Sequence, residues 1–239
     1  PKSGTTSLHE YLLQHTKLFS SWIKEPHFFS YGYDKGVNYY LKNFRFHKNS
    51  IHFESSTDYI YFPDVFKRIK QFNPNMKFII CLRNPIDQVF SHYNHLRQIG
   101  LELDTFEDAL LNDDYKKKLH LKRIERNIYN NQKVAIEIPY IYFGEYVTHI
   151  KQALDVFDYE NFFFINSIDL MHNTQQTMNE IFNFLGLDSL PITITLHNKR
   201  KYEKKMSSEN CEIYLRGFIS LQSHLKSVKL WFRETMCLN

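Results

Sequence analysis

Three short apolar segments, separated by helical patterns, constrain the fold of this chain more than any other feature. They are residues 51–54, 77–82 and 161–165. Runs of this length that are rich in Phe and Ile are typical of parallel strands covered on both faces. Amphipathic helical patterns occupy residues 7–14, 85–97, 175–185 and 208–231. The alternation of strand and helix predicts an α/β fold, a three-layer sandwich with a central parallel sheet flanked by helices.

The composition favours one globular domain over residues 1–239. The chain is 43% hydrophobic and has only seven Gly and seven Pro, so it can bury a sizeable core. A formal net charge of +4 suits an anionic ligand but is too small to predict a nucleic-acid partner. The three Cys have neither a metal-site nor a disulfide-framework spacing, so a reducing, cytoplasmic location is the simplest expectation. The Golgi lumen is the alternative if an anchor lies upstream, and membrane association stays open.

The chain opens with Pro-Lys-Ser-Gly-Thr-Thr-Ser-Leu, a turn that leads into an amphipathic helix. Gly4 lets the backbone come close to an anion, and the following N–H groups and the positive end of the helix can bind phosphate oxygens. Lys2 adds a mobile positive charge. A simple Ser/Thr helix cap is the alternative, but a cap does not need Lys, Gly and two Thr together. The turn therefore predicts a P-loop-like phosphate site formed by Lys2, Ser3, Gly4, Thr5, Thr6 and Ser7.

A P-loop kinase or ATPase is the main rival interpretation. Its motif, G-x-x-x-x-G-K-[ST], places Lys after the second Gly, whereas Lys2 precedes Gly4 here. Such an enzyme also needs an Asp at a strand end to help hold magnesium. The apolar run 77–82 is followed instead by Arg83, which would repel a metal ion and attract a second phosphate. The sequence thus predicts two anion sites on one ligand and no metal site.

Two motifs together resemble those of the sulfotransferases. Residues 1–8 resemble the 5′-phosphosulfate loop of that family, and residues 81–93 resemble its 3′-phosphate motif. The resemblance implies that 3′-phosphoadenosine 5′-phosphosulfate is the donor and that Arg83 and Ser91 contact its 3′-phosphate. Further segments are similar to heparan-sulfate-type and bacterial sulfotransferases, at residues 24–44, 54–69, 142–157 and 198–206. The chain is therefore identified as a single sulfotransferase domain.

The resemblance also implies the catalytic residues. Lys2 would stabilise charge on the leaving phosphate, and Glu25 would be the base. Because Glu25 directly precedes Pro, we expect an extended backbone that presents its carboxylate near the phosphate loop. An ion pair with Lys24 or Lys2 is the alternative. His27 could orient the acceptor, share the base role or be a packed polar side chain.

Glu54 is a further candidate near the acceptor. It is followed by Ser55, where related glycan-modifying enzymes often have Lys.

Two further segments of the chain are rich in Lys and Arg. Residues 198–205 resemble a family loop that folds over the 3′-phosphate, and Lys199, Arg200 and Tyr202 are its candidate nucleotide contacts, with a solvated turn as the alternative. Lys199 stands at the position where the family has Gly. Residues 115–126 are interpreted as an exposed helix face, with an acidic glycan as the alternative partner.

The predicted function is transfer of a sulfuryl group to a hydroxyl, or an amine, of a carbohydrate or similar acceptor. A non-catalytic nucleotide-binding module is a second rival besides the kinase or ATPase. A phosphate turn is normally preceded by a central strand, and none precedes Pro1. We therefore expect an N-terminally truncated domain that lacks a first strand of about five or six residues.

Overall fold

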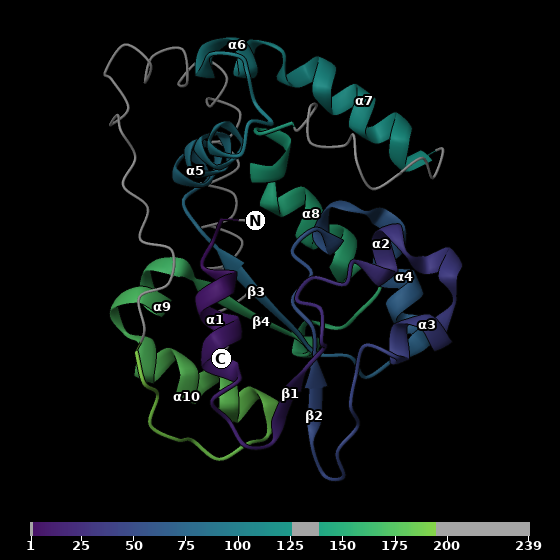
Figure 1. The fold of residues 1–239 in the computed structure, drawn as a ribbon, viewed down its shortest axis with the longest axis vertical. Helices are drawn as coiled ribbons and strands as arrows, with labels where there is room; N and C mark the ends of the chain where they lie inside the picture. Colours follow the sequence, from purple (N-terminus) through teal and green to yellow (C-terminus); the bar gives the residue numbers. More distant parts are fainter. Residues whose placement is uncertain (1, 126–138, 195–239) are drawn as a thin grey trace. The chain divides into compact units, whose positions relative to one another are not determined.

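The computed structural model describes residues 2–125 and 139–194 (Figure 1). These residues form two compact units. The first unit contains residues 2–83 and 153–194, and the second contains residues 84–125 and 139–152. Within the described ranges, no helix combines the length and apolar character needed to cross a bilayer.

The first unit contains the described strands, which form two parallel pairs. They are β1 (Leu18–Ser20) with β2 (Ile51–Phe53), and β3 (Phe78–Leu82) with β4 (Phe162–Asn166). Leu18 lies opposite Ile51 in the first pair, and Phe78 lies opposite Phe162 in the second. The three strands predicted from apolar runs are confirmed to within one residue at either end. β1 was not predicted, because three residues are too few to show a strand period.

Helices pack on both faces of the β3–β4 pair, which confirms the predicted α/β sandwich. Successive side chains of a strand point to opposite faces. On one face Ile79, Cys81, Phe163 and Ile165 join a core that includes side chains of α1 (Thr5–Leu12), α9 (Ser167–His172) and α10 (Thr174–Leu185). On the other face, the Phe78 ring lies 5.4 Å from the ring of Phe66 on α4 (Pro63–Phe72) and 4.8 Å from that of Phe157.

The remaining short elements of the first unit connect these layers. They are α2 (Phe28–Tyr31), α3 (Val37–Leu41) and the 3-10 turns η1 (Tyr33–Lys35), η2 (Tyr59–Tyr61) and η5 (Tyr159–Asn161). The predicted stop after residue 185 is confirmed, because Gly186 ends α10 in the left-handed region, with φ of 74°. The helix predicted over residues 208–231 lies outside the described residues.

The described part of the second unit is helical. It contains α5 (Pro85–Gln98), α6 (Phe106–Leu111), α7 (Asp113–Glu125), η4 (Tyr142–Gly144) and most of α8 (Tyr146–Leu154). α5 begins at Pro85 as predicted, and the Asn84 side chain caps it by accepting from the N–H of Ile86 at 2.9 Å. The core of the second unit includes Val89, Tyr93, Leu96, Phe106, Ala109 and Tyr140.

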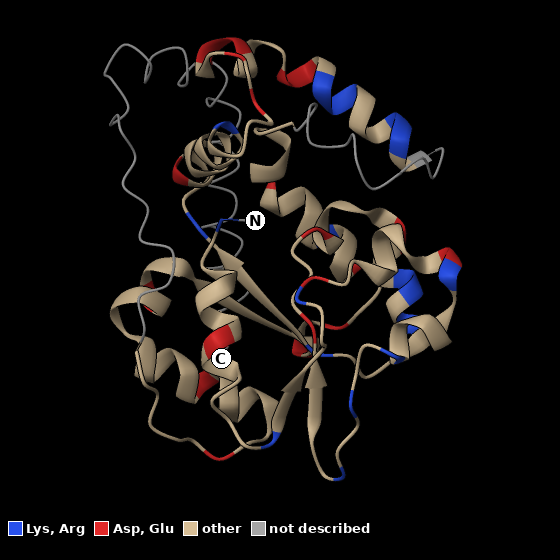
Figure 2. Ribbon diagram, viewed as in Figure 1, with Lys and Arg blue, Asp and Glu red and all other residues tan. Residues whose placement is uncertain are grey.

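The interpretation of residues 115–126 as an exposed basic face is wrong for part of α7. Basic positions recur along this helix (Figure 2). Lys116 and His120 are nevertheless buried, each with 5% of its surface accessible. Lys116 Nζ lies 3.3 Å from a carboxylate oxygen of Glu102, which is itself buried. A buried carboxylate stabilises a buried cation, and this partner cannot be seen from the charge pattern of the helix alone.

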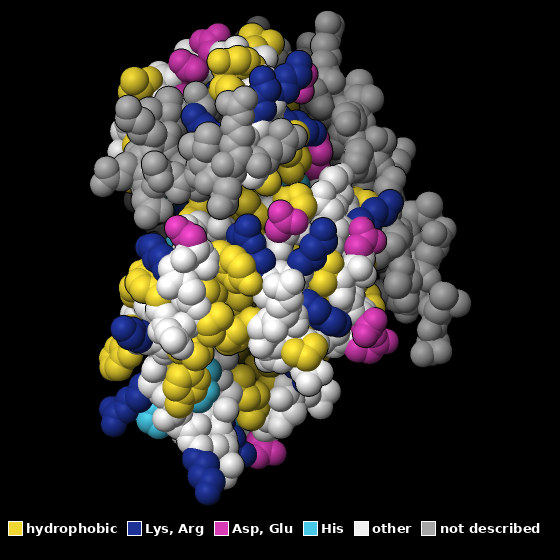
Figure 3. Space-filling view, turned by 90° about the vertical axis from the view of Figure 1, so that its right-hand side faces the viewer, with side chains coloured by type: hydrophobic (Ala, Val, Ile, Leu, Met, Phe, Trp, Pro, Cys, Tyr) yellow, Lys and Arg dark blue, Asp and Glu magenta, His cyan; other side chains and the backbone are white. Residues whose placement is uncertain are grey.

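The described surface mixes charges of both signs. On the face seen in Figure 3, Lys and Arg side chains are interspersed with acidic and apolar ones. This distribution agrees with the small formal net charge of +4.

Candidate functional site

The phosphate turn adopts the backbone that its glycine predicts. Gly4 precedes α1 with φ of 91°, a conformation in which a side chain would be strained. Its carbonyl oxygen accepts from the N–H of Leu8 at 3.1 Å, so the helix starts at once. The N-cap is Gly4 and no side chain caps this end. The first-turn N–H groups of α1 are thus not held by a Ser/Thr cap, and they can face an anion.

The second predicted cation lies against the first motif. Arg83 directly follows β3, and its Nη1 donates to the backbone carbonyl of Lys2 at 3.2 Å. The phosphate turn and the strand-end Arg, 81 positions apart in the chain, therefore meet within the first unit. Ser91 lies on α5 in the second unit and is buried. Lys199, Arg200 and Tyr202 lie outside the described residues.

Two loops leave the same edge of the β1–β2 pair. Because these strands are parallel, residues 21–27 after β1 and residues 54–58 after β2 start at neighbouring carboxyl ends. Ligands of α/β proteins bind at this end of the strands. The first loop carries the predicted base Glu25, and Lys24 Nζ reaches from it to the Thr6 hydroxyl of the phosphate turn at 3.5 Å.

The expectation of an extended backbone at Glu25 is wrong. Glu25 and His27, on either side of Pro26, both have left-handed backbones, with φ of 61° and 51°. Such conformations cost about 1–3 kcal/mol each and persist only where surrounding contacts hold them. Lys24 Nζ lies 3.1 Å from one Glu25 oxygen, and the Thr57 hydroxyl donates to the other at 3.1 Å. These contacts override the local preference of a residue before proline.

The alternative pairing of Glu25 with Lys24 is thus present in the structure. It does not remove Glu25 from the site, because the Glu25 side chain keeps 29% of its surface accessible. Its Oε2 also lies 3.6 Å from Nε2 of His27. A carboxylate with this access and these neighbours can accept a proton from a bound hydroxyl.

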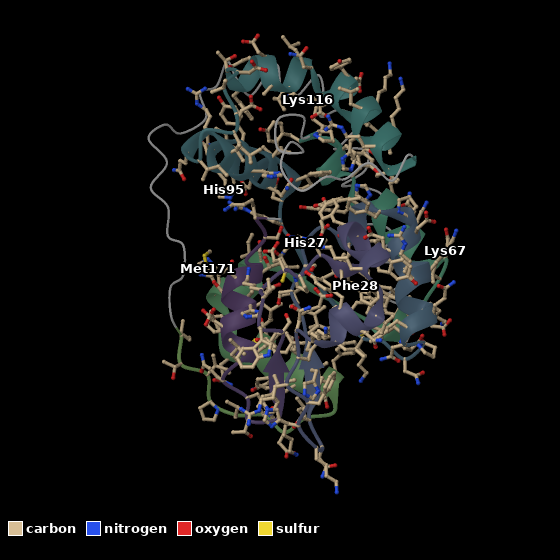
Figure 4. All side chains as sticks on the ribbon, turned by 45° about the vertical axis from the view of Figure 1, so that its right-hand side comes forward. His27, Phe28, Lys67, His95, Lys116 and Met171 are labelled. Atoms are coloured by element: carbon tan, nitrogen blue, oxygen red, sulfur yellow. The ribbon has the colours of Figure 1, made fainter. Side chains whose placement is uncertain are left out.

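His27, labelled in Figure 4, is held on several sides. Its Nδ1 lies 2.7 Å from Oδ1 of Asp58, and its backbone N–H donates to the Ser56 hydroxyl at 2.9 Å. Desolvation lowers the pKa of His27, but the hydrogen bond and charge of Asp58, with the charges of Glu25 and Glu54, outweigh it. The pKa of His27 is therefore raised above its ordinary value, which favours the imidazolium.

Glu54 is partly buried and surrounded by hydrogen-bond donors. Its oxygens accept from the hydroxyls of Tyr40 at 3.1 Å, Tyr59 at 2.7 Å and Ser56 at 2.5 Å. Desolvation raises the pKa of this carboxyl, although the three hydroxyls partly oppose the change. Glu54 anchors the loop that carries Thr57 and Asp58. Next to it, the hydroxyl of Ser55, where related enzymes often have Lys, lies 2.8 Å from Nδ1 of His9.

Ser56, Thr57 and Asp58 also belong to the candidate site and were not predicted from the sequence. All three make side-chain contacts with Glu25 or His27 across about 30 positions of sequence. The available signal was the polar run Glu-Ser-Ser-Thr-Asp, which directly follows a predicted parallel strand. In this kind of fold, polar residues at that place mark a ligand edge.

Comparison with known proteins identifies a family. A family model described as "Sulfotransferase domain" matches residues 1–229. Bifunctional heparan sulfate N-deacetylase/N-sulfotransferase 1 of Mus musculus is 26% identical over 217 residues, which is 85% of this chain and 23% of that relative. Heparan sulfate glucosamine 3-O-sulfotransferase 3B1 of Homo sapiens is 26% identical over 187 residues, covering 78% of this chain and 44% of the relative.

A solved structure has the same fold. The crystal structure of a sulfotransferase from Alicyclobacillus acidocaldarius superposes with a TM-score of 0.74 at 24% sequence identity, covering 95% of this chain and 91% of the other. The likeness supports the P-loop-like α/β sandwich. The chain spans less than a quarter of the N-deacetylase/N-sulfotransferase and less than half of the 3-O-sulfotransferase.

Proposed function

The chain belongs to the sulfotransferase domain family, and from this premise we propose that it transfers a sulfuryl group from 3′-phosphoadenosine 5′-phosphosulfate to a carbohydrate hydroxyl or amine. The observation that carries the proposal is the contact between the two predicted anion-binding motifs, from Arg83 Nη1 to the Lys2 carbonyl. Membership of the family implies this donor in general. The donor nucleotide carries phosphate groups at both the 3′ and the 5′ position of its ribose. Each of the two motifs offers a binding site for one of these groups.

The residues of the two motifs divide the donor between them. Lys2 and the first-turn N–H groups of α1 are assigned to the 5′-phosphosulfate, because a helix N-terminus and a mobile cation both stabilise negative charge. Arg83 is assigned to the 3′-phosphate, since a guanidinium forms paired hydrogen bonds with phosphate oxygens. Ser91, Lys199, Arg200 and Tyr202 are assigned to that phosphate from the family resemblance.

Glu25 is assigned the proton transfer. Sulfuryl transfer, like phosphoryl transfer, requires in-line attack while negative charge develops on the leaving phosphate. Glu25 accepts the proton of the attacking hydroxyl or amine, and Lys2 stabilises the leaving group. Lys24 joins the two tasks, because its Nζ contacts both the Glu25 carboxylate and the Thr6 hydroxyl of the phosphate turn.

A carbohydrate acceptor is supported by two observations. The relatives' names specify heparan sulfate, a carbohydrate, as their substrate. The loop that carries Glu25 also exposes apolar side chains, with Trp22 73% and Ile23 53% accessible. An exposed indole ring offers a flat apolar face with a polar N–H, which suits contact with a sugar.

The proposed function can be tested by calorimetry and a transfer assay on the full chain. We expect 3′-phosphoadenosine 5′-phosphate to bind without magnesium and more tightly than ATP, and the labelled sulfuryl group of the donor to reach a desulfated heparan oligosaccharide. ATP turnover that depends on magnesium would instead support a kinase or ATPase. Nucleotide binding without transfer to any acceptor would support a non-catalytic module.

Two variants separate binding from chemistry. Glu25→Gln should abolish transfer and leave nucleotide affinity nearly unchanged, because it removes the base and keeps the side-chain size. Arg83→Ala should weaken nucleotide binding by about 2 kcal/mol or more, the loss expected for a charged hydrogen bond. Asp64→Asn is the control, because Asp64 is exposed on α4 and pairs only loosely with Lys67 at 3.7 Å. Undiminished transfer in Glu25→Gln would remove Glu25 from its role.

A further inference from the structure

The carboxylate of Asp58 is held in place by hydrogen bonds, although the residue lies in a loop. Its side chain is only 14% accessible, and both oxygens are engaged. Oδ1 lies 2.7 Å from Nδ1 of His27, and Oδ2 accepts from the Ser30 hydroxyl at 2.6 Å. Ser30 is the third residue of α2, and its hydroxyl also donates to the His27 carbonyl at 3.2 Å. The carboxylate therefore has one well-defined orientation, directed at the imidazole.

This contact decides which imidazole nitrogen faces Glu25. A carboxylate accepts hydrogen bonds and does not donate them, so the nitrogen beside Asp58 carries a hydrogen. Nδ1 is then the donor, and Nε2 is the nitrogen that lies 3.6 Å from Glu25 Oε2. The second partner of a histidine commonly sets its tautomer and ring orientation in this way. Asp58, His27 and Glu25 thus form a row of three titratable groups that ends at the proposed base.

We propose that Asp58 is a positioning residue that holds His27 with Nε2 toward Glu25, so that His27 can remove the proton that Glu25 collects. This inference rests on the proposed sulfuryl transfer. As the acceptor O–H bond breaks, its proton goes to Glu25 and a new O–S bond forms. The bond between sulfur and the 5′-phosphate oxygen breaks, and its electron pair leaves with the phosphate. The proton then passes from Glu25 to Nε2 of His27, whose imidazolium Asp58 stabilises, and Glu25 returns to its carboxylate form.

The charges around His27 favour this transfer. Three carboxylates act on the imidazole, namely Asp58 and Glu54 from the loop after β2 and Glu25 from its own loop. Lys24 pairs with Glu25 and offsets part of that charge. The ring of Tyr31 on α2 lies 5.5 Å away and adds no charge. The surroundings therefore stabilise a proton on His27 more than water does.

The first test is nuclear magnetic resonance of His27 in the full chain, which needs no turnover. In the unaltered protein above the titration midpoint, nitrogen shifts should show Nδ1 protonated and Nε2 without hydrogen. In Asp58→Asn the titration midpoint of His27 should move to lower pH, because the nearest negative charge is gone. The control Asp64→Asn should leave the titration midpoint of His27 unchanged. The opposite tautomer in the unaltered protein would overturn the proposal even if Asp58→Asn did not fold.

The second test is the pH dependence of kcat/KM. Since His27 must be neutral to accept the proton, activity should rise with pH through its titration midpoint. Asp58→Asn should lower the maximal rate by about tenfold or more and move this acid limb to lower pH. Asp58→Glu keeps the negative charge and should restore much of the maximal rate and much of the original position of the acid limb. If kcat/KM of Asp58→Asn falls by the same factor at every pH and the acid limb does not move, Asp58 has only a structural role and the proposal is overturned.

Failure of the proposed function is distinguishable from failure of this inference. If the unaltered chain transfers no sulfuryl group while His27 still responds to Asp58→Asn in the resonance experiment, the reaction assignment has failed and the catalytic role of Asp58 falls with it. If the unaltered chain is active and the acid limb is insensitive to Asp58→Asn, the reaction stands and this inference is overturned.

Discussion

Each unit of the molecule holds one glutamate among several hydrogen-bond donors, and the pKa values of the two glutamates shift in opposite directions. Glu54, in the first unit, accepts from Tyr40, Tyr59 and Ser56. Among the described residues, no Lys or Arg forms an ion pair with it. Desolvation dominates, and the pKa of Glu54 is raised. The Ser56 N–H also donates to Glu54, at 3.3 Å, but uncharged donors alone do not replace the water that this carboxylate loses.

Glu102, in the second unit, has a cation as well. Its oxygens accept from the Tyr140 hydroxyl at 2.8 Å and the Asp104 N–H at 3.0 Å, and Lys116 Nζ lies 3.3 Å away. Desolvation by itself would raise the pKa of Glu102, but these three partners together lower it. The Tyr140 hydroxyl and the Asp104 N–H contribute most to the lowered pKa of Glu102, and the charge and hydrogen bond of Lys116 add to it. At Glu54 the hydrogen-bond donors do not outweigh desolvation.

The two arrangements suit different purposes. Glu54, held by uncharged donors, is one of the carboxylates whose negative charge raises the pKa of the nearby His27. Glu102, paired with Lys116, contributes a fixed contact between the segment after α5 and α7. The comparison predicts that Glu102 stabilises the fold in its charged form, through its ion pair and hydrogen bonds, and that Glu54 stabilises the fold less when it is charged than when it is protonated.

The largest expected effect is the loss of the buried cation. Lys116→Met, at the residue labelled in Figure 4, should destabilise the protein by about 3–5 kcal/mol, because it leaves Glu102 charged and unpaired inside the protein. Denaturant unfolding at pH 7 measures the change.

Lys118→Met is the matched control on the same helix, since Lys118 is exposed and should change stability by less than about 0.5 kcal/mol. The double variant Lys116→Met with Glu102→Leu should recover most of the loss, because no buried charge remains. Equal effects at Lys116 and Lys118 would contradict the buried ion pair.

The burial of Lys116 also shows where sequence reasoning stops. The strands at residues 77–82 and 161–165 and the start of α5 were predictable, because each depends on composition within a few residues. The meeting of Lys2 and Arg83 followed from the rule that parallel strands carry their ligands at one end. The role of Lys116 depends on a partner 14 positions away in another segment, and a helix face with several Lys does not reveal it.

Only part of the candidate site could be predicted from the sequence, because other residues of the site belong to a distant segment of the chain. Glu25 and His27 were found from a segment that resembles a family. Asp58 acts on His27 from 31 positions further along, and no local pattern links the two. The left-handed backbone of Glu25 reverses the preference of a residue before proline, because Lys24 and Thr57 hold its side chain. Contacts between loops decide such features.

A smaller effect should separate the tyrosines that donate to the two glutamates. Tyr140→Phe removes a hydrogen bond to a carboxylate whose pKa is lowered and should cost about 1.5–3 kcal/mol, whereas Tyr40→Phe removes one to a carboxyl whose pKa is raised and should cost about 1 kcal/mol. Both side chains are buried, so loss of packing is similar. Unfolding free energies at pH 7 give the comparison. A larger cost at Tyr40 than at Tyr140 would reverse the assignment of charge.

The smallest effect is a difference in the sign of a pH dependence. The folded-state pKa of Glu54 lies above the unfolded one, so its contribution to stability is complete at acid pH and is lost as pH rises through the folded-state pKa. The folded-state pKa of Glu102 lies below, so its contribution is complete above the unfolded pKa and is lost as pH falls. Glu54→Gln should therefore gain stability relative to the unaltered protein between pH 4 and pH 7, and Glu102→Gln should lose it. Unfolding of the two variants at both pH values measures the slopes, and slopes of the same sign would contradict the opposite pKa shifts of the two glutamates.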